Sequence, residues 1–422
     1  MRLLVITPHL CPDTAPTGVV VSRIVEELGA AGHDVHVVTS LPWYRDHRVE
    51  DGWRGRLVRR GSEGSASVVR LPPFAGRKER LVGRALGFAA FSGAAALAAI
   101  AARGPFDAVM VLSPPLTLGP AGWVAARRHR CPLVLNVQDV FPDVAIEVGA
   151  IASPRLIRLF RSLERFCYRR SDAVTVLSDD LAANVTAKLG GSSHDPLVRV
   201  IPNFVDTATI RPLDRDTPYR REFGLGERTV VMYAGNLGHS QPLGIIVEAA
   251  RRHGDRDDIA YVINGGGVAA ADLRRAAEDL SNLTVVGYQP ADRVPEVLAS
   301  ADVHVVALRR GLSASSVPSK MYSILAAGRP LIASVDEGSE VARVVGEAGA
   351  GVAVPPEDAD AFVAAVERLA GDAGERTSMG ARDVRGRSGG QRRDPPPTPT
   401  GASWSNSDCD DRIRPLNRGG RR

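Results

Sequence analysis

Short apolar runs alternate with segments of helical period along most of this 422-residue chain. Runs rich in Val, Leu and Ile and bounded by loop residues indicate buried strands. In the first half they predict strands at residues 3–7, 34–39, 68–71, 108–112, 133–137 and 173–177, with 68–71 at a sheet edge. Apolar positions three or four apart predict helices at 19–31, 118–130 and 153–170. Strands that alternate with helices predict a parallel sheet covered on both faces.

The second half repeats this pattern, with strands expected at 229–234, 260–264, 283–286, 303–308 and 330–334. We therefore expect an α/β protein of two Rossmann-like, doubly wound domains, joined in the proline-punctuated stretch 196–212. The first domain is expected over residues 1–195 and the second over residues 196–380. In sheets of this kind the binding site lies beyond the carboxyl ends of the strands.

Residues 381–422 have a different composition, rich in Arg, Pro, Gly and Ser and almost without apolar periodicity. Such a segment buries too little apolar surface to offset the entropy of ordering, so we expect a disordered tail. Two origins fit it equally: an ordinary flexible tail, or the loss of a folded terminal helix through a change of reading frame.

The charge balance argues against nucleic acid as a partner. The formal net charge is +5, and the last 40 residues hold nine Arg and five Asp, so +4 of it lies there. No interleaving of basic and aromatic residues marks a nucleic-acid surface. The four cysteines lack metal-ligand spacing, and the chain opens on a strand rather than a secretory leader. We expect a cytoplasmic protein without a bound metal.

The segment 85–102, ALGFAAFSGAAALAAIAA, is the one membrane candidate in the sequence. Its eighteen residues are barely long enough to span a bilayer, and Ala and Gly are only weakly hydrophobic. Arg77, Lys78, Arg80 and Arg84 precede it. We favour a packed core helix, with a helix lying on the inner face of a membrane as the alternative.

The segment Val317–Pro330, VPSKMYSILAAGRP, carries the clearest site signal. Pro318 predicts a helix start and Gly328 predicts its end. Free N–H groups at the start of a helix, together with the Lys320 ammonium, suit a diphosphate group. A capped helix with a surface lysine is the alternative interpretation.

Nine local patterns follow one another over roughly residues 1–380: LLVITPHLCPDTAPTG, AAGHDVHVVTSLPWY, VQDVFPDV, YRRSDAVTVLS, VIPNFVD, VMYAGNLGHSQPL, VINGGG, ADVHVVAL and VPSKMYSILAAGRP. In this order they resemble the family-4-type glycosyltransferases, whose two-domain architecture is called GT-B. The similarity is greatest to bacterial enzymes that extend cell-surface polysaccharides, such as colanic-acid and N-acetylfucosamine transferases.

The resemblance implies two domains facing a central cleft and a hexosyltransferase type of activity. A sugar would pass from a nucleoside diphosphate sugar to an acceptor hydroxyl, with retention at the anomeric carbon. The resemblance implies no metal and no other cofactor, and a sugar or a lipid-linked sugar as acceptor. The product would belong to the cell envelope or to an extracellular polysaccharide.

On the donor side, the resemblance implies that fixed cations and N–H groups neutralise the phosphates. Lys320 is the expected catalytic cation, with Arg309 as a helper, although a solvated loop explains Arg309 equally well. Gly235 and Asn236 follow the first strand of the second domain, where small residues let the backbone approach the donor. Gly266 is expected at the nucleotide, although a glycine turn after a strand is also ordinary.

Many relatives carry two glutamates eight residues apart, one toward the sugar and one toward the ribose. The AAGRP anchor puts these positions at Ser315 and Ser323 in this chain. We expect Ser323, Ser316 and Glu340 to contact the donor in their place.

On the acceptor side, Asp139 lies at a strand end and is expected to orient or deprotonate the acceptor hydroxyl. A helix cap is the alternative for Asp139 and the preferred role for Asp143. Gly18 begins a helix and is expected near the donor phosphates, unless it only connects strand and helix. His9 faces the acceptor side on weaker grounds, and His239 is either a phosphate contact or a solvated loop residue.

Two other functions stay open at this point. A sugar-nucleotide epimerase of the same fold would carry several acids and a histidine in the cleft, most of which this chain lacks. A non-catalytic or damaged relative is suggested by the missing glutamates and the unusual tail.

Overall fold

The computed structural model describes residues 1–44, 48–55, 57–73, 81–193 and 195–382. The expected disordered tail from residue 383 onward, together with Arg77, Lys78 and Arg80, lies outside the described residues. The described chain divides into two compact units, Met1–Pro202 (unit 1) and the part from Asn203 onward (unit 2). The division falls within the stretch 196–212.

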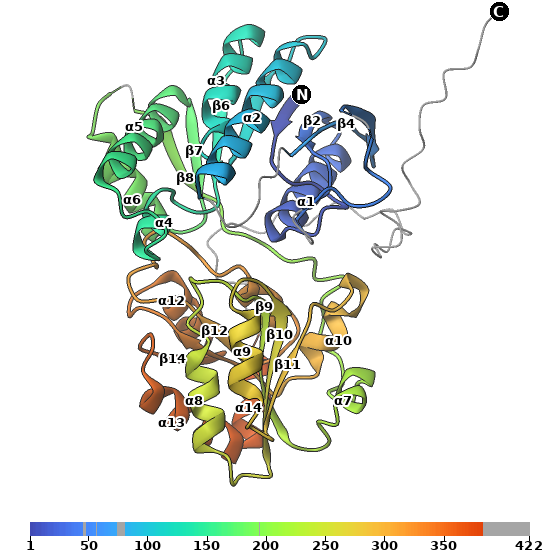
Figure 1. Ribbon diagram of the computed structural model, residues 1–422, viewed down its shortest axis with the longest axis vertical. Coiled ribbons are helices and arrows are strands. Elements are labelled where there is room, and N and C mark those ends of the chain that lie inside the picture. Colours follow the sequence, from blue (N-terminus) through green and yellow to red (C-terminus); the bar gives the residue numbers. More distant parts are fainter. Residues whose placement is uncertain (45–47, 56, 74–80, 194, 383–422) are drawn as a thin grey trace, which may run out of the picture. The chain divides into compact units, whose positions relative to one another are not determined.

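The described part of unit 1 is built on one sheet. Its strands are β1 Arg2–Ile6, β2 Asp34–Ser40, β3 Arg59–Glu63, β4 Ala66–Leu71, β5 Ala108–Ser113, β6 Leu133–Val137, β7 Ala173–Val176 and β8 Leu197–Val200. They lie in the order β3-β4-β2-β1-β5-β6-β7-β8 (Figure 1). Neighbouring strands pair in parallel except β3 and β4, which are antiparallel.

The sequence prediction was wrong about the edges of this sheet. The segment expected at an edge, β4, lies between β2 and β3. The true edges are β3, RRGSE, and β8, LVRV, neither of which was predicted. Both strands are largely exposed, and an edge strand that buries neither face has no need of an apolar run.

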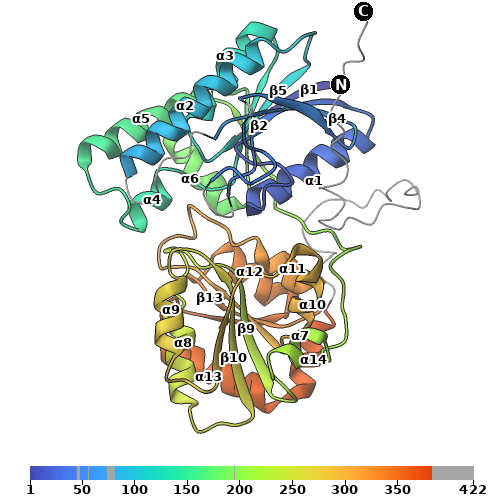
Figure 2. The same cartoon turned by 45° about the vertical axis from the view of Figure 1, so that its right-hand side comes forward.

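The helices of unit 1 are α1 Pro16–Ala30, α2 Leu81–Ile100, α3 Leu118–His129, α4 Asp143–Glu147, α5 Pro154–Arg170 and α6 Asp179–Leu189. Val21 and Val25 of α1 pack with Val5 and Val37 of the sheet. On the other face α2, α3 and α5 form a layer in which α3 contacts both of its neighbours (Figures 1 and 2).

Helix α2 contains the segment that the sequence marked as the membrane candidate. Phe91, Ala95 and Ala99 are buried, whereas Leu86 and Leu97 are exposed, so the helix packs through one side only. Among the described residues, no helix is long and apolar enough to cross a membrane.

Unit 2 has a second sheet in the described residues, with strands β9 Thr229–Asn236, β10 Ile259–Gly266, β11 Leu283–Val286, β12 Val303–Ala307, β13 Leu331–Ser334 and β14 Gly351–Val354. Their order is β11-β10-β9-β12-β13-β14, and all neighbours are parallel. The helices are α7 Pro218–Glu222, α8 Gly244–Arg252, α9 Ala270–Ala277, α10 Val294–Ala299, α11 Lys320–Ala326, α12 Glu340–Ala348, α13 Ala359–Gly371 and α14 Ala373–Gly380, with a 3-10 turn at Ala291–Arg293.

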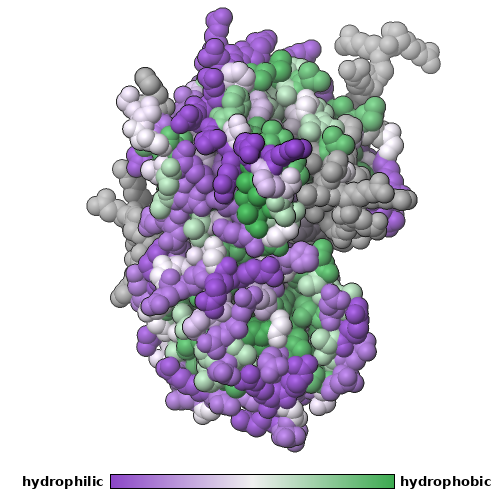
Figure 3. Space-filling view, turned by 60° about the vertical axis from the view of Figure 1, so that its left-hand side comes forward, coloured by the Kyte–Doolittle hydropathy of each residue, from purple (hydrophilic) through white to green (hydrophobic). Residues whose placement is uncertain are grey.

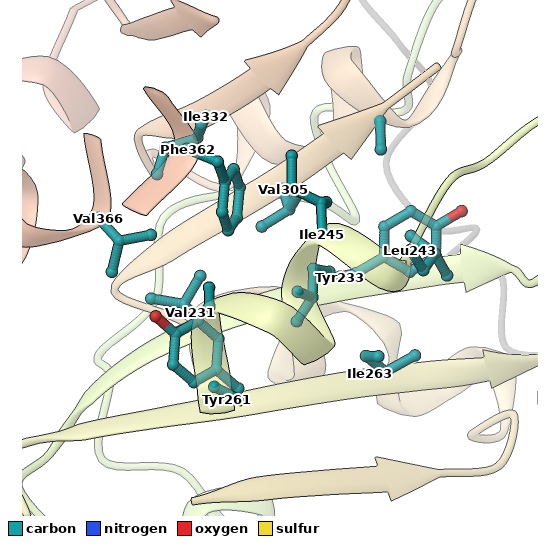
Figure 4. Close-up of a cluster of buried hydrophobic side chains, with 14 of the residues drawn as sticks. Val231, Tyr233, Leu243, Ile245, Tyr261, Ile263, Val305, Ile332, Phe362 and Val366 are labelled. Carbon is teal, nitrogen blue, oxygen red and sulfur yellow. The ribbon is translucent and has the colours of Figure 1, made fainter. Parts of the chain in front are cut away.

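Alternation along β9 shows why this sheet is covered on both faces. Val231 and Tyr233 point into a cluster with Phe362 of α13 (Figure 4). Val230 and Met232 point to the opposite face and pack with residues of α7 and α10. Because both faces are buried, the strand reads as a continuous apolar run. The prediction of two doubly wound α/β units is confirmed.

Each sheet has a point at which the strand order reverses. It lies between β1 and β5 in unit 1, and between β9 and β12 in unit 2. Crevices outside the carboxyl ends of strands at such points bind ligands in open α/β sheets. We therefore expect ligand-binding residues at these two places.

Candidate functional site

Lys320 lies at the point in unit 2 where the strand order reverses, and it links α11 to β9. It is the first residue of α11, in the connection after β12, and its Nζ donates a hydrogen bond to the hydroxyl of Tyr233 on β9. Nζ also lies 3.6 Å from the centroid of the Tyr233 ring. The Tyr233 hydroxyl donates in turn to the Asn236 carbonyl at 2.7 Å. Lys320 is thereby held at the carboxyl end of β9.

The amine of Lys320 is enclosed without an anionic partner. Burial lowers the pKa of Lys320 to about 7, and no charged neighbour in the described part of the chain contributes to that shift. Of the three N–H bonds of the ammonium, one has a partner among the described residues. A desolvated cation with free donors is an electrostatically unsatisfied group, which an anion would satisfy.

Glycines make room for this arrangement. A Cβ on Gly235 would lie 3.1 Å from Lys320 Nζ, and Gly235 has φ +144°. A Cβ on Gly265 would lie 1.9 Å from the Gly235 carbonyl oxygen. The end of β10 therefore lies directly against the end of β9, where Gly265 pairs with Gly235. The backbone hydrogen bond from Leu237 N to Gly266 O, at 2.9 Å, ties the two strand ends together.

The structure thus brings Lys320, Gly235, Asn236 and Gly266 together. The exposed side chain of Asn236 lies over the next turn, since a Cβ on Gly267 would be 2.9 Å from Asn236 Oδ1. The backbone N of Arg309 donates to Ser240 O, in the loop after β9, at 2.9 Å. Its guanidinium lies 3.9 Å from the carboxylate of Glu357.

Tyr288 is a candidate that sequence reasoning missed. It follows β11 and its ring covers Gly266, where a Cβ would lie 2.8 Å from Tyr288 Cε2. The residue is 55% exposed, so a flat ring faces outward beside the glycine turn. An aromatic residue shortly after the run LTVV was the available signal, but nothing in the sequence placed it over Gly266.

The serines at the expected glutamate positions are not equivalent. Ser315 is fully buried and its hydroxyl donates to Leu312 O at 3.1 Å, so it is part of the turn. Ser316 is half-buried, and its backbone N donates to the same carbonyl at 2.9 Å. Ser323 is half-buried in α11, three residues after Lys320 and therefore on the same side of that helix.

Glu340 lies at the start of α12 rather than beside Lys320. Its carboxylate is 2.8 Å from Arg343, and its charge helps burial raise the pKa of Tyr322 to about 12. Ser339 caps the same helix by accepting from Ala342 N. His239 is exposed in the loop after Gly238.

In unit 1, His9 and Asp13 form a hydrogen-bonded pair after β1. His9 Nδ1 lies 2.6 Å from Asp13 Oδ2, and the Asp13 side chain is completely buried. The other carboxylate oxygen of Asp13 accepts from Tyr44 N at 3.0 Å. Because a carboxylate only accepts, it holds the hydrogen on Nδ1 and leaves Nε2 of neutral His9 as an acceptor. Sequence reasoning had singled out His9 but not its buried partner.

Aromatic rings and a glycine surround this pair. The His9 ring stacks on Trp43 with a centroid distance of 5.7 Å and meets Tyr44 edge-on at 5.5 Å. Gly18 lies behind His9, since a Cβ at position 18 would be 3.1 Å from His9 Cβ. Gly18 thus lets α1 pass close to the histidine.

Asp139 and Asp143 occupy different environments. Asp139 is half-buried two residues after β6, next to a buried network in which Gln138 donates to Asn136 at 2.6 Å. The cap expected of Asp143 was wrong: the N-cap of α4 is Pro142, and the Asp143 carboxylate accepts from Lys188 of α6 at 2.6 Å. Lys188 also contacts the buried Glu164 at 2.6 Å, so Asp143 belongs to an ion-pair network rather than to a helix cap.

The described residues contain no group of three or more His, Cys, Asp or Glu side chains placed to hold a metal ion.

Comparison with family models assigns each unit separately. Residues 17–203 match the glycosyl transferase 4-like domain, and residues 228–372 match the glycosyl transferases group 1. A protein of Escherichia coli (strain K12) described as a colanic acid biosynthesis glycosyl transferase, WcaI, is 27% identical over 377 residues, covering 87% of this chain and 92% of that protein. WbjE of Pseudomonas aeruginosa, described as a glycosyltransferase, is 29% identical over 240 residues, 56% of this chain and 59% of its own.

Solved structures show the same fold at low identity. Sucrose-phosphate synthase (tll1590) from Thermosynechococcus elongatus gives a TM-score of 0.67 at 17% identity, covering 90% of this chain and 92% of that one. Anabaena Alr3699/HepE in complex with UDP and glucose gives 0.66 at 14% identity, with 90% and 93% covered. The expected GT-B fold is confirmed. Because the two family models together match more than three quarters of the residues, one on each unit, the chain belongs to the glycosyltransferases with a 4-like domain followed by a group 1 domain.

Proposed function

We propose that this glycosyltransferase takes its sugar from a nucleoside diphosphate sugar and that Lys320 stabilises the departing diphosphate. The observation that carries the proposal is the Lys320 ammonium, enclosed beside Gly235 and Tyr233 without an anionic partner. A diphosphate gains negative charge as the bond to the sugar breaks, so a fixed cation at this point favours the transition state.

The surrounding groups supply the rest of a donor site. Gly235 lets the diphosphate approach the backbone beside Lys320 Nζ, because it carries no side chain there, and Gly265 makes room for the Gly235 carbonyl. The exposed ring of Tyr288 beside Gly266 offers a face on which a nucleobase stacks. We also include Asn236, Arg309, Ser316, Ser323 and Glu340 as donor contacts of lower rank.

On the acceptor side, we propose that His9, oriented by Asp13, accepts a hydrogen bond from the acceptor hydroxyl. Asp13 is buried and keeps the His9 ring in one tautomer, so Nε2 is an acceptor of fixed direction. Trp43 beside it is the kind of flat apolar surface on which a sugar ring packs. Asp139 stays a second candidate for this role, and Gly18 contributes space for His9 rather than a phosphate contact.

Retention at the anomeric carbon and activity without a metal ion are further parts of the proposal, and they rest on the family resemblance. The relative WcaI is described as a colanic acid biosynthesis enzyme, which supports a role in cell-envelope or extracellular polysaccharide. The acceptor is then a sugar or a lipid-linked sugar. The HepE structure contains UDP, so UDP is the first nucleotide to test.

The test is thermal unfolding of the full chain with UDP, GDP, ADP or TDP, each with and without magnesium. Binding at a hundredfold excess over Kd stabilises the folded state by about 2.7 kcal/mol. We expect one base to raise the melting temperature equally with and without magnesium, and Lys320→Met to abolish the shift. Shifts for none of the nucleotides, or an unchanged shift in Lys320→Met, would overturn the donor proposal.

A transfer assay then separates this activity from epimerisation. The sugar nucleotide that matches the binding base is incubated with the enzyme, with and without a sugar acceptor, and the products are identified by NMR. Transfer requires the acceptor and leaves an anomeric configuration that reports retention directly. Conversion of the sugar nucleotide into its epimer without acceptor would favour the epimerase.

A further inference from the structure

Helix α5 exposes an unusually basic side. Its seventeen residues, PRLIRLFRSLERFCYRR, contain six arginines and one acidic residue, Glu164. The Glu164 side chain is only 1% exposed and points inward to Lys188. All six arginines are exposed: Arg155, Arg158, Arg161, Arg165, Arg169 and Arg170.

The first four of these arginines have no acidic partner in the described part of the chain. Within the described ranges, Arg155, Arg158, Arg161 and Arg165 form no ion pair. Exposed arginines on unit 2 are different, because Arg251 lies 2.8 Å from Glu248 and Arg275 lies 3.2 Å from Asp272. The positive charge of α5 is therefore available to an external partner.

Apolar side chains accompany this charge. Leu156 is 38% exposed and Leu159 is 61% exposed, both in the first two turns of α5. Leu159 is four residues after Arg155 and so lies next to it on the helix surface. The later part of the helix is covered, since Phe166 packs edge-on against Trp123 of α3 at 5.5 Å. The exposed leucines thus extend the apolar stripe of α5 beyond what the fold buries.

The neighbouring helices α2 and α3 also lack negative charge. Neither α2 nor α3 contains an acidic residue. In α3, Arg127, Arg128 and Val124 are exposed. Figure 3, in which the side of α5 in Figure 1 comes forward, shows hydrophobic groups set among strongly hydrophilic ones on unit 1. The described parts of three adjacent helices therefore expose no carboxylate.

We propose that the α5 face, made of Arg155, Leu156, Arg158, Leu159, Arg161 and Arg165, docks on an anionic lipid surface. Guanidinium groups bind anionic head groups, and leucines between them insert at the boundary of head groups and acyl chains. The two exposed leucines favour lipid over nucleic acid, whose phosphates would gain nothing from them. The proposal moves the membrane contact from residues 85–102, where the sequence suggested it, to α5. It does not depend on the donor site.

The experiment measures binding of the purified full chain to vesicles by co-flotation, without nucleotide. Vesicles of phosphatidylcholine alone are compared with vesicles that also contain the anionic lipid phosphatidylglycerol. We expect binding to the anionic vesicles only, and weaker binding as salt increases. Arg155→Ser, Arg158→Ser and Arg165→Ser combined should lower the partition coefficient about a hundredfold, near fivefold for each arginine.

A second variant and a matched control separate charge, insertion and folding. Leu156→Ser with Leu159→Ser should weaken binding while leaving its salt dependence. Arg251→Ser, Arg274→Ser and Arg275→Ser remove the same charge from unit 2 and should leave binding unchanged. Melting temperatures show that all variants are folded. Failure of the native chain to bind anionic vesicles, equal loss in the control, or displacement from vesicles by an RNA oligonucleotide would overturn the proposal.

Discussion

The ammonium of Lys320 in α11 lies 3.6 Å from the centroid of the Tyr233 ring. Tyr233 is on β9, which borders the point where the strand order reverses. Tyr233 is itself fully buried, and its hydroxyl donates a hydrogen bond to the Asn236 carbonyl. The cation is thus held by a neutral hydroxyl and an aromatic face, rather than by a carboxylate. Such a position stabilises an incoming anion without a competing internal partner.

This position of Lys320 lowers the stability of the folded protein when no ligand is bound. Its pKa falls from 10.5 in an open chain to about 7 in the folded state because of burial. Between these pH values the unfolded chain holds the proton and the folded chain does not, so stability rises with pH across that window. Below pH 7 the cost is fully present. We expect Lys320→Met to raise the melting temperature by about 2–4 °C at pH 6 for each ~1 kcal/mol of cost removed, with little change at pH 10.

Lys188 provides the control of opposite sign. It is paired with Asp143 and with the buried Glu164, each at 2.6 Å. Lys188→Met leaves two carboxylates unpaired and should destabilise the protein by about 3–5 kcal/mol. Equal effects of the two substitutions on thermal unfolding would contradict the difference drawn between them.

The affinity for a nucleoside diphosphate should depend on pH through the same amine. A bound diphosphate raises the pKa of Lys320, so binding takes up a proton when the free amine is neutral. The dissociation constant is therefore expected to increase from pH 7 to pH 9, by up to about tenfold per unit. Calorimetry in two buffers of different ionisation enthalpy measures the proton directly. A flat profile in the native chain, or the same slope in Lys320→Met, is incompatible with this role.

Gly265 is expected to be sensitive to substitution for steric reasons. A Cβ on Gly265 would meet the Gly235 carbonyl at 1.9 Å, and Gly265 has φ +155°. Gly265→Ala should lower the melting temperature and abolish nucleotide binding, because the paired ends of β9 and β10 are forced apart. Gly287→Ala, after the adjacent strand β11, meets nothing within 4 Å and is the control. Loss of binding in the control alone would place the site elsewhere.

Tyr288 should contribute to binding of the nucleobase and not to binding of the phosphates. Removal of a stacked aromatic ring costs about 1–3 kcal/mol per base. Tyr288→Ala is therefore expected to weaken UDP binding about 5- to 150-fold, whereas Tyr288→Phe keeps it. Pyrophosphate, which has no base, should bind both variants and the native chain equally by competition calorimetry. A parallel loss for pyrophosphate would mean that the ring supports the glycine turn instead.

Asp13 tests the acceptor side separately from the donor. In Asp13→Asn the amide oxygen still accepts from Tyr44 N, while the amide nitrogen faces His9 Nδ1 and moves the ring hydrogen to Nε2. Transfer should fall tenfold or more, in the direction known for wrong-tautomer variants. Nucleotide binding measured without acceptor should be unchanged. Asp139→Asn provides the comparison, and a larger loss there than in Asp13→Asn would assign the acceptor to Asp139.

Local pattern was enough for the buried parts of the fold. Strands such as β9 and β12 are largely apolar because helices cover both faces, and this signal does not need the rest of the chain. The edge strands of unit 1 could not be predicted because they are largely exposed and need no apolar side chains. Strand β3, RRGSE, is held by backbone pairing to β4, and such pairing leaves no trace in side-chain hydrophobicity.

The candidate site divides along the same line. The sequence by itself determined that Lys320 opens a helix and that glycines lie at the ends of β9 and β10, because caps and turns are decided by a few neighbouring residues. Only the tertiary structure decided that Lys320 meets Tyr233, 87 residues away, that Asp13 is buried behind His9, and that Tyr288 covers Gly266. It also showed that Arg155, Arg158, Arg161 and Arg165 of α5 are exposed together. Contacts of this kind depend on the order in which strands assemble, and strand order is set by the packing of the whole sheet rather than by any segment of it.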